Sequence, residues 1–271
     1  MPLLHLVALS LVQGITEFLP ISSSGHLVLT WETLGSEVPQ PDQLIVDIAV
    51  HVGTLAAVCG YFRGDIWAML TGAVAGVAGR PTPGTRLAVL VLLASLPVVA
   101  AGVLLRDVVD DLVRDVEVIA WTTLGFGVLL YVADRAAGQL RRLPDMRWAD
   151  AVMIGLMQVL ALVPGTSRSG ITMTAGRLLG YGRREAARFS MLLAIPAIAG
   201  AGTMAGLDVY QSGNLALGLD ALIAAAMAFA AAWLAIALLM RWLAVASFTP
   251  FVIYRIALGG LLLALIYTGV L

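Results

Sequence analysis

Apolar residues occur along this chain in runs that are long enough to cross a lipid bilayer. The hydrocarbon core of a bilayer is about 30 Å thick, and a helix of about 20 apolar residues spans it. We expect six such crossings, near residues 44–62, 86–105, 117–133, 187–206, 217–241 and 250–270. The pattern predicts an all-α polytopic membrane protein with a single integral-membrane domain over residues 1–271.

Two more apolar stretches, residues 4–29 and 151–180, are interrupted in the middle by Pro, Ser and Gly. Such a break frees backbone N–H groups, which a membrane tolerates only where protein or a water-filled cavity satisfies them. We therefore expect two re-entrant helix–loop–helix hairpins, each entering and leaving on one side. The short, Gly-rich segment 64–79 is expected to lie at the membrane interface.

The two interrupted stretches carry the same motif, 145 positions apart. Four pairs of residues are identical: Gln13 and Gln158, Ser22 and Ser167, Ser24 and Ser169, and Gly25 and Gly170. Glu17 and His26 occur only in the first copy, and Arg168 only in the second. We infer a duplication, with repeats over about residues 1–133 and 151–271.

The charged residues orient the crossings. Arginines concentrate in residues 63–86, 134–150 and 177–188, whereas 106–117 and 207–220 are mainly acidic. Since cytoplasmic loops are enriched in basic residues, the first three segments are expected in the cytoplasm and the other two outside. The repeats are then inverted, and their polar tips meet inside the membrane, where such proteins form binding sites. Arg255, near the cytoplasmic start of the last helix, is expected to snorkel outward.

Composition and charge argue against several other kinds of function. A net charge of −1 gives no reason to expect a nucleic-acid partner, and one cysteine, Cys59, permits no disulfide within the chain. All basic residues are arginines, which excludes a Walker-type phosphate loop because that loop requires a lysine.

The two tips have the chemistry of an anion site. Each precedes a helical run, and helix starts offer free N–H groups and a positive dipole end, while the Arg168 guanidinium suits phosphate oxygens. The residues expected to hold a diphosphate are Ser22, Ser24, Gly25, Thr166, Ser167, Ser169, Gly170 and Thr172. The alternative is that Ser and Gly only cap two half-helices.

Glu17 and His26 are the candidates for acid–base chemistry. A carboxylate in an apolar helix must be paired, metal-bound or protonated. Glu17 and Gln13, one turn apart, could ligate Mg²⁺ or Ca²⁺ or hold a water, or Glu17 could form a structural ion pair with Arg168. His26 could act as acid, base or nucleophile, or remove a proton from Ser23 or Ser22, and the spacing does not decide among these roles.

At these residues the chain resembles the undecaprenyl-diphosphate phosphatase family, the bacitracin-resistance type of integral-membrane phosphatase. The resemblance rests on Gln-Gly-Ile-Thr-Glu-Phe-Leu-Pro-Ile-Ser-Ser-Ser-Gly-His at 13–26 and Pro-Gly-Thr-Ser-Arg-Ser-Gly at 164–170, with further similarity at 47–54 and 189–196. It implies removal of the terminal phosphate from a C55 polyprenyl diphosphate, which regenerates the lipid carrier for cell-wall synthesis. It also implies a divalent cation, six crossings with two re-entrant hairpins, and a site open to the extracytoplasmic side of the bacterial plasma (inner) membrane.

The family motifs assign roles to single residues. Glu17 becomes the essential carboxylate, Ser22 to Ser24 the serine loop, His26 the histidine, and Ser167, Arg168 and Thr172 the arginine loop. Gln13 stands where some relatives have Glu, which favours a mechanism with a single carboxylate.

The sequence also bears on two other functions. Inverted repeats and broken helices are typical of transporters, so a lipid flippase is the alternative, although Glu17 and His26 beside an anion site favour hydrolysis. A second membrane phosphatase superfamily fails because Thr174 stands where its histidine is needed. The expected partners are the lipid substrate and the bilayer, and a homodimer stays open.

Overall fold

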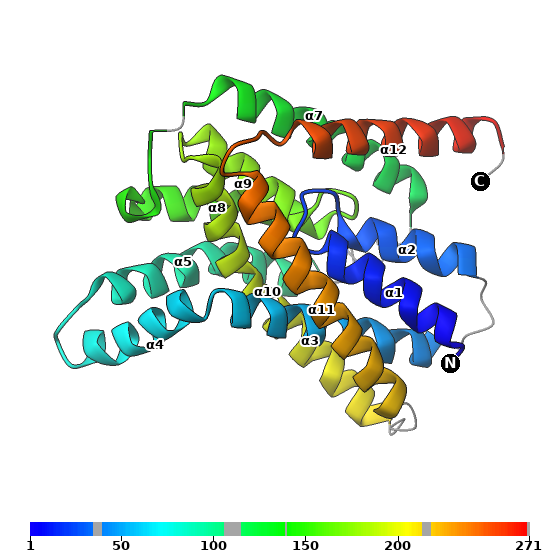
Figure 1. Cartoon of the computed structure of the whole chain (residues 1–271), viewed down its shortest axis with the longest axis horizontal. Helices are drawn as coiled ribbons and strands as arrows, with labels where there is room; N and C mark the ends of the chain where they lie inside the picture. The colour runs from blue at the N-terminus through cyan, green and yellow to red at the C-terminus, as the bar shows by residue number, and fades with distance from the viewer. Residues whose placement is uncertain (35–39, 106–114, 139, 213–217, 270–271) are drawn as a thin grey trace.

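The protein is built from helices, as the pattern of apolar runs predicts (Figure 1). The computed structural model describes residues 1–34, 40–105, 115–138, 140–212 and 218–269. Its α-helices are α1 (Leu3–Thr16), α2 (Ser23–Leu34), α3 (Gln40–Tyr61), α4 (Arg63–Val77), α5 (Pro83–Leu104), α7 (Val116–Ala136), α8 (Trp148–Val159), α9 (Arg168–Leu178), α10 (Arg183–Ser212), α11 (Gly218–Trp242) and α12 (Thr249–Tyr267).

Five helices of the described residues are long and apolar enough to cross a membrane: α3 from Asp42, α5, α7, α11 and α12. They match five of the six expected crossings and confirm a polytopic membrane protein. The sixth expected crossing, residues 187–206, lies within α10, which is not among these five helices. The acidic residues 106–114, and the expected crossing ends at 217 and 270, lie outside the described residues.

Both interrupted stretches form two helices separated by a polar loop. In the first, α1 ends at Thr16 and α2 begins at Ser23. In the second, α8 is followed by a 3-10 turn, Leu160–Leu162, and α9 begins at Arg168. The expected helix–loop–helix form is therefore present in each copy.

Each hairpin packs on helices of the other half of the chain. Helix α1 lies along α11, and α8 lies along α5. Glycines permit both approaches: a Cβ added to Gly14 would stand 2.8 Å from the Ala228 carbonyl oxygen, and one added to Gly155 would stand 2.5 Å from that of Ala94. The two halves therefore interlock, and both polar loops are carried into the interior.

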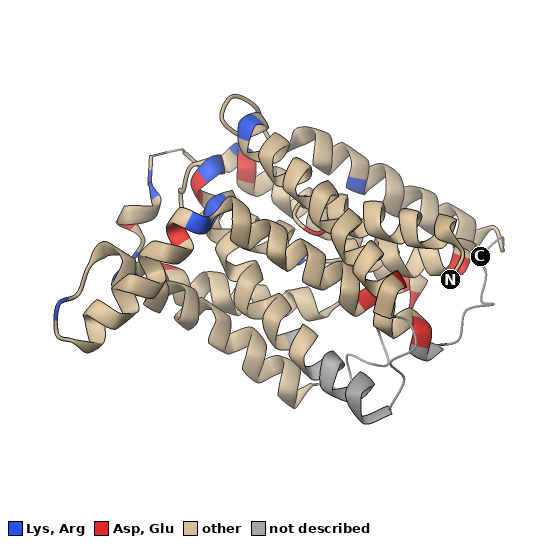
Figure 2. Ribbon diagram, turned by 60° about the horizontal axis from the view of Figure 1, so that its bottom comes forward, with Lys and Arg blue, Asp and Glu red and all other residues tan. Residues whose placement is uncertain are grey.

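The arginines concentrate toward the end of the molecule opposite both termini (Figure 2). Several are paired there: Arg177 and Arg183 with Asp134, Arg188 with Asp65, and Arg141 with Asp150. Arg177 is fully buried and also donates to the backbone carbonyl oxygens of residues 134, 137 and 138, so it closes the C-terminal end of α7. The basic segments identified in the sequence thus share one end of the bundle.

Candidate active site at the two hairpin tips

The two tips have the same backbone conformation. Ser22 (φ 76°) and Ser167 (φ 71°) are the non-glycine residues with positive φ in the described part of the chain. Each serine Oγ accepts a hydrogen bond from the backbone N–H three residues later, that of Gly25 (3.4 Å) or Gly170 (3.1 Å). The duplication seen in the sequence therefore extends to an uncommon conformation, and such conformations cluster at functional sites.

The same serines contact a second serine two residues on. The Ser22 and Ser24 hydroxyls are 3.3 Å apart, and those of Ser167 and Ser169 are 3.2 Å apart. Ser169 Oγ also donates to the Leu19 carbonyl oxygen at 2.9 Å, which ties the second tip to the first. The tips therefore meet, as the inverted-repeat interpretation expects.

Glu17 is the centre of this junction. Arg168 Nη2 donates to Glu17 Oε1 at 3.0 Å, while Glu17 Oε2 accepts from Gln13 Nε2 at 2.9 Å and from Ser23 Oγ at 2.7 Å. The Glu17 and Arg168 side chains are both largely buried. The structure thus brings Gln13, Glu17, Ser23 and Arg168 together. Glu17 and Arg168 form the ion pair that was one of the alternatives left open by the sequence.

The arginine loop is braced from α10. Arg168 Nη1 donates to the Ser190 carbonyl oxygen at 3.0 Å, and Thr172 Oγ1 donates to Ser190 Oγ at 2.7 Å. Thr172 therefore lies beside the arginine and contacts Ser190, which belongs to the similar stretch 189–196 but had no role assigned to it. Thr166 Oγ1, on the same loop, is buried without a hydrogen-bond partner in the structure and is available to a ligand.

His26 contacts the backbone of the first tip and a tyrosine of α12. Its Nδ1 lies 2.6 Å from the Ser22 carbonyl oxygen and its Nε2 lies 2.6 Å from the Tyr254 hydroxyl. A carbonyl only accepts, so we assign the ring hydrogen to Nδ1, which leaves Nε2 to accept from Tyr254. The Ser23 hydroxyl donates to Glu17 instead. Nothing in the motifs singled out Tyr254.

The expectation for Arg255 was wrong. It does not snorkel outward: its side chain is fully buried and donates to the carbonyl oxygens of Thr123 (2.9 Å), Gly165 (3.0 Å) and Pro20 (3.3 Å). Pro20 belongs to the first tip and Gly165 to the second. The broken helices leave these carbonyls without helical partners in the interior, and a five-donor guanidinium satisfies several at once.

His51 and Asp47 form an i, i+4 pair of polar residues in the sequence, and both lie on α3. His51 Nδ1 lies 2.6 Å from the backbone carbonyl oxygen of Asp47, whose carboxylate accepts from Trp31 Nε1 at 3.1 Å. The two residues do share one face of α3, as their spacing predicts.

The junction contains oxygen ligands suited to a hard cation. No cluster of three or more His, Cys, Asp or Glu side chains occurs in the described ranges. Gln13 Oε1, however, is buried next to the Glu17 carboxylate and has no hydrogen-bond partner among the described residues. Mg²⁺ is often held by one or two carboxylates together with substrate phosphates, so these residues fit a cation whose coordination phosphate oxygens complete.

Comparison with known proteins identifies the family. Residues 6–261 match the model described as bacitracin resistance protein BacA. The chain belongs to the BacA family. It is 51% identical to undecaprenyl-diphosphatase 1 of Rhodospirillum rubrum, over 99% of this chain and 97% of the relative. It is 48% and 46% identical to undecaprenyl-diphosphatases of Ruegeria pomeroyi and Roseobacter denitrificans, each over 99% of this chain and 100% of the relative.

Proposed function

We infer that this protein hydrolyses undecaprenyl diphosphate to undecaprenyl phosphate and orthophosphate. Relatives that match it over nearly their full length are named for this activity. The observation that carries the inference is the meeting of the two tips, where Glu17 and Arg168 are joined at 3.0 Å. The reaction recycles the lipid carrier for cell-wall synthesis, in keeping with a family described by bacitracin resistance.

We propose that the protein lies in the bacterial plasma (inner) membrane with α10 as the sixth crossing and the two hairpins re-entrant. The arginine-rich end would face the cytoplasm. The site at the tips would then open to the extracytoplasmic side, where the diphosphate headgroup enters while its isoprenoid chain stays among apolar helix surfaces. The shared backbone conformation of the two tips and the interlocked halves support this arrangement.

Charge neutralisation is assigned to the tips. In the proposed complex the Arg168 guanidinium turns from Glu17 to the terminal phosphate, and the serine hydroxyls and Thr166 Oγ1 donate to the remaining oxygens. Gln13 and Glu17 would hold a divalent cation, which supplies further positive charge against the phosphates. Phosphoryl transfer depends mainly on such positioning and electrostatic stabilisation.

Glu17 is also the proposed base. In one route it takes a proton from water, whose oxygen attacks the terminal phosphorus as the bond from that phosphorus to the bridging oxygen breaks. In the other route Ser23 Oγ attacks the terminal phosphorus first, and the bond to the bridging oxygen breaks to release undecaprenyl phosphate and leave a phosphoserine. Glu17 takes the serine proton, a transfer that the 2.7 Å contact between them favours. Water then releases orthophosphate from the serine. His26 remains a candidate acid–base group through Nε2.

The test is orthophosphate release from undecaprenyl diphosphate by the purified protein in detergent, with and without EDTA. No gradient exists in detergent, so release of phosphate separates hydrolysis from transport. We expect EDTA to abolish release, and Glu17→Ala and Arg168→Ala to lower it by two orders of magnitude or more, on the order of ~3 kcal/mol of transition-state stabilisation. The exposed arginine in Arg184→Ala is the matched control and should leave it unchanged. Near wild-type turnover by either site variant contradicts this mechanism.

A further inference from the structure

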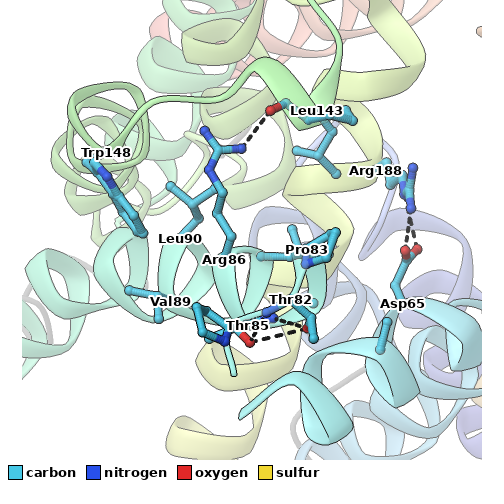
Figure 3. A pocket seen from close by; sticks show the side chains of 15 residues that line it. Asp65, Thr82, Pro83, Thr85, Arg86, Val89, Leu90, Leu143, Trp148 and Arg188 are labelled. Carbon is cyan, nitrogen blue, oxygen red and sulfur yellow. Dashed lines mark hydrogen bonds and ion pairs between the residues drawn. The ribbon is translucent and has the colours of Figure 1, made fainter. Parts of the chain in front are cut away.

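A cavity lies apart from the tips, between α4, the start of α5 and the starts of α8 and α10 (Figure 3). Its volume is about 730 Å³, within the range of small-molecule sites. It shares no residue with the junction around Glu17. The function inferred above therefore gives this cavity no role.

The cavity is amphipathic. Its walls are mainly apolar and include Leu87, Val89, Leu90 and Leu143, and the half-exposed Trp148 stands at its side (Figure 3). Tryptophan is enriched where a membrane meets water. Helix α5, which supplies much of the wall, is one of the helices able to cross a membrane. The cavity thus lies where a helix able to span the membrane begins, which is the level of the lipid headgroups.

Its polar groups leave a net positive charge. The charged side chains that line it are Arg86, Arg188 and Asp65. Arg188 is paired with Asp65, through Nε at 3.1 Å and through Nη2. Arg86 donates to the carbonyl oxygens of Pro144, at 2.6 Å, and Met146, which carry no formal charge. The cavity is therefore lined by two guanidinium groups and one carboxylate.

We propose that this cavity binds an anionic phospholipid of the adjacent leaflet. Its anionic headgroup lies between Arg86 and Arg188, and the first part of its acyl chains runs along Val89 and Leu90. Charge complementarity selects an anionic headgroup over a zwitterionic one, and basic pockets between membrane helices are suited to such headgroups. The apolar wall distinguishes the site from one for free phosphate, which would need polar groups on most sides.

The lipid has a structural consequence. Through Arg86 the cavity is joined to the segment Leu143–Asp145 and Met146, which leads into α8 and so into the second hairpin. An occupant that also contacts Arg188 would tie α5 to α10. We therefore expect bound lipid to raise the thermal unfolding temperature of the protein.

The test is native mass spectrometry and thermal unfolding of the full chain in detergent, with phosphatidylglycerol or phosphatidylcholine added at equal concentration. We expect retained phosphatidylglycerol and a higher unfolding temperature only with that lipid. Asp65→Asn removes the negative charge and should tighten binding about fivefold, whereas Arg188→Gln should weaken it by at least about fivefold. Arg184→Gln, an exposed arginine of the same helix outside the cavity, is the control and should bind as the unchanged protein does.

A second variant separates shape from charge. Val89→Trp fills the apolar wall, keeps every charge and should abolish lipid retention in protein that stays monodisperse. Equal retention of both lipids, or equal affinities of Arg188→Gln and Arg184→Gln, would overturn the proposal. So would displacement of the lipid by inorganic phosphate alone, which would identify a free-anion site. Retention of undecaprenyl phosphate without phosphatidylglycerol would also overturn it, since the cavity would then be a product site.

Discussion

At the scale of single residues, the site depends on a buried arginine, Arg255, whose guanidinium donates hydrogen bonds to backbone carbonyl oxygens. Arg255 donates to carbonyls of both tips and of α7, and no ion pair is formed by it in the part of the chain that the structure describes. It is therefore a positioning residue, which fixes the loops that carry the anion-binding groups. Gly127 and Gly170 allow this, because a Cβ at either would stand 2.9 Å from the Arg255 side chain.

Arg255→Lys tests this role, because it keeps the charge and removes the planar set of donors. We expect at least tenfold slower orthophosphate release and a loss of roughly 2–3 kcal/mol of stability, since buried carbonyls lose their partners. Turnover and thermal unfolding in detergent measure the two effects. Arg241→Lys, on the exposed end of α11, is the matched control and should change neither. A lysine variant with normal stability and normal turnover would show that the carbonyl contacts are dispensable.

Charged residues that interrupt apolar runs in the sequence predicted some residues of this site but not all of them. Glu17 and Arg168 were found because each interrupts an apolar run inside a repeated motif, and the structure pairs them. The same signal was present at Arg255, where proximity to a helix start favoured snorkelling; that prediction was wrong because the hairpin carbonyls need donors in the interior. Tyr254 gave no signal, since a hydroxyl in an apolar helix is unremarkable until its neighbour is known. Ser190 lies in the similar stretch 189–196, but nothing in the sequence indicated its contact with the arginine loop.

At the scale of helices, the position of each hairpin depends on close contact with a helix of the other half. Because α8 approaches α5 at Gly155, and α1 approaches α11 at Gly14, backbone lies against backbone at both crossings. Duplication of the tip motif predicted the two hairpins. It did not predict these contacts, because Gly14 and Gly155 are not equivalent positions of the 145-residue repeat.

Gly155→Val should displace the second hairpin, because the new side chain would overlap the Ala94 carbonyl, which is backbone and cannot rotate away. Overpacking of this kind costs about 1–3 kcal/mol, and we expect an unfolding temperature roughly 5 °C lower. Orthophosphate release should also fall, since α8 leads to the Arg168 loop. Gly260→Val, at a helical glycine with open space around it, is the control for the helix propensity of valine. Equal behaviour of the two variants would refute the close-packing argument.

At the scale of the whole molecule, apolar runs predicted the all-helical membrane class and six crossings, and long apolar helices match five of them. The sixth predicted crossing, residues 187–206, falls within α10. Its segment from Ala186 to Ala194 is buried apart from Arg188. A helix enclosed by other helices need not be uniformly apolar, because it contacts protein instead of lipid. Arg188 and Ser190 can therefore lie within it, where they contact Asp65 and the arginine loop. The placement of the arginines is the basis of the proposed orientation in the membrane.

Labelling of single cysteines tests that orientation on intact cells. Replacing the chain's one cysteine by Cys59→Ala gives the background for Glu32→Cys and Arg184→Cys, both at exposed positions. Glu32 lies near the end of α2, at the end of the molecule with the N-terminus, where the Met1 amino group contacts Asp220. We expect a membrane-impermeant maleimide to label Glu32→Cys in intact cells and Arg184→Cys only after permeabilisation, because arginine-rich segments stay in the cytoplasm. The reverse pattern would place the arginine-rich end outside and make the first hairpin open to the cytoplasm. Labelling of both positions in intact cells would contradict an arrangement in which the hairpins enter from opposite sides.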